Sequence, residues 1–159
     1  MILYHGSTTV VRTIDLNYSQ PNKDFGRGFY LSETEDQARA LAMFKSSLFG
    51  LSPIVNAYYI DEAVLVDGTL RVKRFEGYTR EWAEFILANR TAEDGETHHG
   101  YDVVYGPIAN DRVGLQIRRL LEKETDFDTF VRKLQYIKGI TFQYYFGTQK
   151  AIDQLYYYE

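Results

Sequence analysis

Apolar and polar positions alternate in several short stretches of the chain, which is the pattern of β-strands with one buried face. The clearest case runs from Thr69 to Phe75, where Leu70 and Val72 alternate with Arg71 and Lys73. Other short stretches rich in aromatic and β-branched residues predict further strands at 2–5, 28–31, 53–60, 102–105 and 140–146. Gly106-Pro107 is expected to end the strand at 102–105.

Helical periodicity and capping residues occupy the segments between these strands. The run 32–35 (Ser-Glu-Thr-Glu) fits a capping box that opens a helix. Thr79 is placed to cap a helix that ends at Arg90, and Asn110 or Asp111 to cap another. Two more helices are expected over 126–138 and 148–155. Because strands and helices do not alternate regularly, we expect an α+β fold rather than a doubly wound α/β fold.

Composition narrows the class of protein. The 159 residues show no repeat, low-complexity tract or linker, so we expect a single domain over 1–159. Fourteen Tyr and ten Phe favour a β-rich fold, and some of these rings could stack on a ligand. A net charge of −4 argues against a protein that coats duplex nucleic acid, although nucleic acid as a transient substrate is not excluded.

Several kinds of site and location are disfavoured by what the chain lacks. Without cysteine there is no disulfide, thiolate zinc site or cysteine nucleophile. His98 and His99 are adjacent and would point to opposite faces of a strand, so we expect a solvated loop rather than a metal site. No apolar run reaches the roughly 18 residues that span a bilayer, and the N-terminus lacks a signal pattern. We therefore expect a cytoplasmic protein with no membrane partner.

Two segments carry candidate binding chemistry. The run 24–32 places two glycines around Arg27, one of them Gly28, and follows them with an aromatic pair that ends at Tyr30. The run 3–7 places His5 on a short apolar strand. Glycine lets the backbone approach a ligand, an aromatic ring offers a flat face, and an imidazole can bond to a hydroxyl. Together they predict a site for a nucleotide-like ligand, although a lone histidine at a strand end is also a common structural residue.

These segments resemble the ADP-ribosyltransferase superfamily, most closely its diphtheria-toxin and poly(ADP-ribose) polymerase branch. The match lies in His-Gly-Ser on the first strand and Gly-basic-Gly-aromatic-Tyr on a later strand that a helix follows. Over nearly its whole length, the chain also resembles a bacterial family of uncharacterised proteins assigned to that superfamily, through segments 22–30 and 101–112. The resemblance implies a split core of mixed and antiparallel β-sheet with flanking helices.

The resemblance also implies roles for single residues. His5 would bond to the adenosine ribose of NAD, and the backbone of Gly6 would hold the nicotinamide carboxamide, with Ser7 beside it. Gly28 belongs to the same NAD-binding set. Tyr30 would stack on the nicotinamide ring and so take part in catalysis.

The sequence departs from the superfamily at a third element. In the polymerase-like branch, a glutamate on a late strand stabilises the oxocarbenium-like transition state, whereas the strand 140–146 carries Gln143. A neutral amide can accept a ribose hydroxyl bond but cannot stabilise positive charge, and losing such a group costs on the order of a hundredfold in rate. The resemblance therefore implies mono-transfer rather than chain elongation. Alternatively, Gln143 is an outward-facing strand residue.

Asp111 and Arg112 form a further candidate pair. Asp111 could deprotonate an acceptor or bond to the ribose, and Arg112 could pair with the pyrophosphate. Ordinary helix capping after Gly-Pro explains the same residues.

The leading functional hypothesis is an NAD-dependent mono-ADP-ribosyltransferase, a bacterial toxin or defence effector with an antitoxin protein as partner. It would use NAD as substrate without a metal, and its acceptor would be a protein or a nucleic acid. The alternatives are an NAD glycohydrolase, a non-catalytic module that binds NAD or ADP-ribose, and a protein-interaction scaffold.

Overall fold

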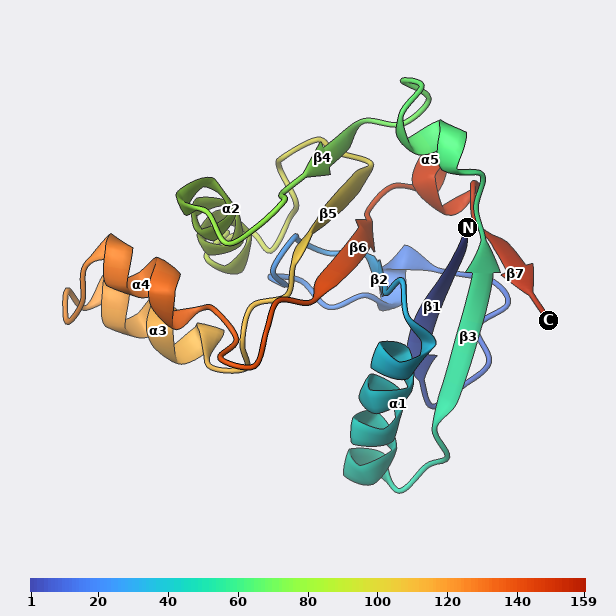
Figure 1. Cartoon of the computed structure of the whole chain (residues 1–159), viewed down its shortest axis with the longest axis horizontal. Helices are drawn as coiled ribbons and strands as arrows, with labels where there is room; N and C mark the ends of the chain where they lie inside the picture. Colours follow the sequence, from blue (N-terminus) through green and yellow to red (C-terminus); the bar gives the residue numbers. More distant parts are fainter.

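Seven strands form two sheets in the computed structural model, which describes residues 1–159 (Figure 1). The first sheet is antiparallel, in the order β1 (Ile2–Ser7), β3 (Ile54–Tyr59) and β7 (Tyr156–Tyr158). The second has the order β2 (Phe29–Leu31), β6 (Phe142–Phe146), β5 (Val103–Pro107) and β4 (Val72–Arg74), and only its β4–β5 pair is parallel. The predicted α+β fold is confirmed.

A single bridge joins the two sheets. The backbone N–H of Tyr4 donates to Ser32 O at 2.9 Å, and the N–H of Ser32 donates to Tyr4 O at 2.8 Å. No residue of β2 itself pairs with β1, so the sheets separate on either side of this bridge. That separation is the feature of the fold on which the candidate site depends.

Five α-helices lie around the sheets. They are α1 (Glu35–Phe49), α2 (Arg80–Arg90), α3 (Val113–Leu121), α4 (Phe127–Lys133) and α5 (Gln149–Ile152), and two 3₁₀ turns cover Leu16–Tyr18 and Glu62–Leu65. Helix α1 packs on β1 and β3, whereas α2, α3 and α4 gather at the opposite end of the molecule (Figure 1). None of these helices has both the length and the apolar character needed to cross a bilayer.

Two hydrophobic clusters fill the spaces on the two faces of the second sheet. Val103 of β5 and Tyr144 of β6 belong to the cluster on the face toward the first sheet. Val104 and Tyr145 belong to the cluster beneath α2, α3 and α4. Successive strand residues point to opposite faces, so β5 and β6 supply both clusters.

Local capping explains where several helices begin. Thr79 caps α2 by accepting from Trp82 N at 3.1 Å, and α2 ends at Arg90 as predicted. The predicted capping box at 32–35 is wrong by two residues, because Thr34 is the N-cap of α1 and accepts from Gln37 N. The backbone of Ser32 is instead hydrogen-bonded to Tyr4 in the bridge between the sheets.

Other predicted boundaries also differ from those in the structure. Strand β5 continues through Gly106 and Pro107 because both pair with β6. Neither Asn110 nor Asp111 caps α3, whose N-cap position is Arg112 without a side-chain bond. Helix α4 ends at Lys133, five residues earlier than expected.

Candidate functional site

A cavity of about 700 Å³ opens where the two sheets separate. It is bounded by β1, β2, the segment between them, one face of α1 and the end of α2. Five of the predicted site residues line it, and they come from three strands and the segment before β2: His5, Ser7, Gly28, Tyr30 and Gln143. The fold therefore brings together residues separated by more than a hundred positions in the chain.

His5 presents a neutral imidazole to this cavity. Its Nδ1 lies 2.7 Å from the backbone oxygen of Tyr30, which can only accept, so the ring proton resides on Nδ1. The ring also stacks on Phe29 at a centroid distance of 4.1 Å. Burial lowers the pKa of His5 to about 4, so the imidazole is uncharged at neutral pH. Nε2 has no protein partner and is left as a hydrogen-bond acceptor.

Tyr30 is held rigidly at the cavity wall. Its hydroxyl donates to Gly26 O at 2.8 Å and accepts from Phe25 N at 3.0 Å. Its ring packs edge-to-face against Tyr145, with centroids 5.5 Å apart. The ammonium of Lys23 lies 5.3 Å from the centroid of the same ring. A ligand ring that stacks on that face therefore needs Lys23 to move aside.

Gln143 reaches the cavity from β6. It lies two residues from Tyr145, so both side chains occupy the same face of the second sheet. Its backbone pairs with Gly106, but its side-chain amide makes no hydrogen bond within the protein. The amide is therefore free to bond to a ligand.

Gly6 occupies a different place from the predicted one. It is buried against α1, where a Cβ atom would lie 2.1 Å from Ala38 O, and it does not line the cavity. Its carbonyl oxygen accepts from Lys45 Nζ at 2.9 Å. The glycine is thus required by helix packing, and its oxygen is already bonded where the resemblance expects a carboxamide.

Gly28 lines the cavity, but its backbone is also bonded. Ser19 Oγ accepts from Gly28 N at 2.8 Å and donates to Gly28 O at 2.7 Å. A Cβ atom at this position would lie 2.2 Å from the ring of Tyr145. Close packing of that ring is enough to explain the glycine, and a ligand contact at Gly28 stays a prediction.

Ser7 lies at the cavity edge, in a turn that a buried amide holds. Ser7 Oγ accepts from Thr9 N at 3.3 Å. Asn56, which is fully buried, accepts from Val11 N at 2.8 Å and donates to Thr9 O at 3.0 Å. These bonds fix the segment that forms one wall of the cavity.

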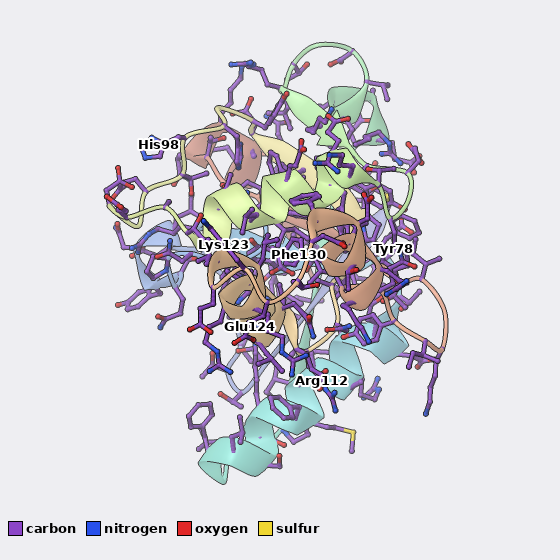
Figure 2. The ribbon with its side chains drawn as sticks, turned by 90° about the vertical axis from the view of Figure 1, so that its left-hand side faces the viewer. Tyr78, His98, Arg112, Lys123, Glu124 and Phe130 are labelled. Atoms are coloured by element: carbon purple, nitrogen blue, oxygen red, sulfur yellow. The ribbon has the colours of Figure 1, made fainter.

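Asp111 and Arg112 do not line the cavity. Figure 2 shows Arg112 at the start of α3, on the side of the molecule that carries α2, α3 and α4. Asn110 Oδ1 accepts from Arg112 N at 2.9 Å, so this stretch is a turn that leads into the helix. Neither Asp111 nor Arg112 is positioned to contact a ligand beside His5.

Sequence reasoning missed the charged residues of the cavity. Lys23, Lys45, Asp24 and Arg90 all line it, and the Arg90 Nη2 and Asp24 Oδ1 atoms are 2.7 Å apart. Lys45 lies one helical turn after Leu41 on the face of α1 that meets the cavity. The spacing of Leu41 and Lys45 on α1 could have predicted that both lie on the same face of the helix. No local pattern in the sequence marks Arg90 as a cavity residue.

The adjacent histidines have separate bonds. His98 Nε2 lies 2.7 Å from Asp94 Oδ2 at the surface (Figure 2). His99 donates from Nε2 to Phe25 O at 2.8 Å and accepts at Nδ1 from Tyr101 N at 3.0 Å. No group of three or more His, Asp or Glu side chains is arranged to hold a metal ion.

Comparison with known proteins yields a family but no function. Neither the curated proteins nor the solved structures include a match to this chain. The resemblance to the ADP-ribosyltransferase superfamily therefore stays a prediction. One family model, described as "Protein of unknown function (DUF3990)", matches residues 1–157. The chain belongs to the DUF3990 family.

Proposed function

We propose that this chain is an NAD-dependent mono-ADP-ribosyltransferase, a glycosyltransferase that transfers ADP-ribose from NAD to a macromolecule. The supporting observation is that His5, Tyr30 and Gln143 line one cavity, because these are the residues to which the motif resemblance gives roles toward NAD. The cavity volume, about 700 Å³, is within the range of small-molecule sites.

In this proposal each of these side chains has a defined task. His5 Nε2 accepts a hydrogen bond from a ribose hydroxyl, because Nδ1 holds the ring proton. Tyr30 offers a rigid aromatic face, and the free amide of Gln143 accepts from the hydroxyl of the reacting ribose. The C1′–N bond breaks and its electron pair leaves with nicotinamide. The acceptor then bonds to C1′ and releases its proton.

Release of nicotinamide from NAD, followed by chromatography, tests this proposal. Gln143→Glu introduces a carboxylate that stabilises developing positive charge, so we expect release to rise by on the order of a hundredfold. Gln143→Leu should lower it. Because the Gln143 side chain has no protein partner, both variants should fold. Gln154→Glu, the same chemical change outside the cavity, serves as the control and should leave release unchanged.

A non-catalytic module that binds NAD or ADP-ribose is the second candidate, and one observation favours it. The two carboxylates that line the cavity are Asp15 and Asp24, and both are already bonded. Asp15 accepts from Asn17 N at 2.9 Å, and Asp24 pairs with Arg90. Binding of NAD without nicotinamide release, even by Gln143→Glu, would select this module. Release without an acceptor would instead indicate an NAD glycohydrolase, in which water replaces the acceptor.

A protein or nucleic-acid acceptor, an antitoxin partner and a cytoplasmic location complete the proposal. Incubation of the protein with labelled NAD and a cell extract would test for the acceptor. Label in protein or in nucleic acid would identify its class. Absence of label in both, together with nicotinamide release, would indicate hydrolysis.

A further inference from the structure

Positive charge gathers at the cavity although the chain as a whole is acidic. Lys23 lies in the segment before β2, Lys45 on α1 and Arg90 at the end of α2, and all three line the cavity. The protein carries a net charge of −4. Three elements far apart in the sequence thus deliver cations to the same space.

Two carboxylates, Asp15 and Asp24, line the cavity and do not balance the three cations. Asp24 is nearly buried, with 12% of its side chain exposed, and is engaged by Arg90. The side chain of Lys23 forms no ion pair or hydrogen bond, and its ammonium lies above the ring of Tyr30. Lys45 bonds to the backbone oxygen of Gly6 rather than to an anion. Neither ammonium group therefore forms an ion pair with a carboxylate.

The two lysines also repel one another and their neighbours. Desolvation and then the charge of Arg90 lower the pKa of Lys23, and the charge of Asp24 opposes them. Desolvation and then the charge of Lys23 lower the pKa of Lys45. An anion bound between them would relieve this repulsion, because an opposite charge favours the protonated ammonium.

We propose that Lys23 and Lys45 form a subsite for the diphosphate group of a nucleotide ligand. This subsite deepens the proposed function, which supplies such a ligand in NAD. Ammonium groups suit phosphate as compact point charges. Movement of Lys23 from the ring of Tyr30 to a bound phosphate would uncover that aromatic face, and the free acceptor of His5 lines the same cavity. One cavity would then offer partners for a ring, a sugar hydroxyl and a phosphate. A simple carboxylate ligand would bond to the cations alone and would leave the ring of Tyr30 and the acceptor of His5 without a partner.

Calorimetric titration with NAD and with three simpler probes tests the subsite. ADP-ribose contains the diphosphate group, adenosine contains no phosphate, and inorganic pyrophosphate is the diphosphate group alone. Lys23→Gln and Lys45→Gln should each weaken ADP-ribose and pyrophosphate binding about tenfold, which corresponds to the loss of one charge-assisted bond. Adenosine binding should not change. Lys150→Gln, an exposed lysine on α5, is the matched control and should bind like wild type.

The outcomes separate this inference from the proposed function. Equal weakening of adenosine and ADP-ribose by the lysine variants would overturn the subsite, because the loss would then be structural. NAD binding that the lysine variants leave unchanged would also overturn it, while the proposed function would stand. Lysine-dependent pyrophosphate binding without NAD binding would support the subsite and refute the proposed function. Binding of no probe by the wild type would refute both.

Discussion

The neutral state of His5 makes stability depend on pH in a calculable way. An ordinary histidine has a pKa of 6.5, whereas burial lowers that of His5 to about 4 in the folded protein. As the pH falls below 6.5, the imidazole therefore binds a proton in the unfolded state but not yet in the native state. Stability is present in full above pH 6.5 and is lost as the pH falls toward 4.

The magnitude follows from the difference between the two pKa values. At about 1.4 kcal/mol per pKa unit, the native state loses about 3 kcal/mol once the pH is below 4, and about 2 kcal/mol of this is lost by pH 5. Coulombic repulsion from Lys45 and Lys23 acts in the same direction as burial. The hydrogen bond to the Tyr30 oxygen opposes it, because it favours the protonated ring.

Urea denaturation near pH 7.5 and near pH 5 measures this effect, with the fluorescence of the buried Trp82 as the signal. His5→Gln keeps a donor toward the Tyr30 oxygen but cannot titrate, so it serves as the reference. Carboxylates titrate in both proteins and cancel in the comparison. Wild type should lose about 2 kcal/mol more than His5→Gln between the two pH values. An equal loss would show that the pKa of His5 is not lowered in the folded protein and would refute this reasoning.

Two further substitutions probe the walls of the cavity. Gly28→Ala should lower the unfolding free energy by about 1–3 kcal/mol, because its Cβ overlaps the ring of Tyr145, and a thermal melt should show it. Gly77→Ala is the control and should be nearly neutral, since nothing lies within 4 Å of its added Cβ; equal melting temperatures for the two variants would contradict the packing role. Asn56→Ala should cost about 2 kcal/mol, because two bonds to segment 9–11 are lost. Limited proteolysis should then cut that segment faster than in wild type, and unchanged protection would argue against its role as a clamp.

Local signals predicted the helices better than their ends. Thr79 and the apolar face after it suffice to begin α2, because a cap and its target lie within one turn of each other. Ser32 is an equally good N-cap residue by type, yet the N-cap of α1 is Thr34, two residues later. The reason is that the backbone of Ser32 is hydrogen-bonded to Tyr4. Pairing with a distant strand overrode the local preference.

The candidate site was likewise predictable from the sequence only in part. Motif resemblance led to His5, Tyr30 and Gln143, and the fold brings all three to one cavity. It also assigned ligand contacts to two glycines. In the structure, Gly6 is packed against Ala38 and Gly28 is packed against Tyr145. A glycine motif in a sequence does not reveal whether a ligand or a side chain fills the space beside it.

The sequence by itself determined the α+β class and the positions of most strands and helices, and it led to the prediction of a nucleotide site. These depend on periodicity and capping, which act over a few residues. Only the tertiary structure decided that the sheets meet at one bridge, that a cavity opens beside it, and that lysines from separate elements converge there. Such features arise from contacts between residues far apart in the chain, and no local pattern encodes which distant partners will meet.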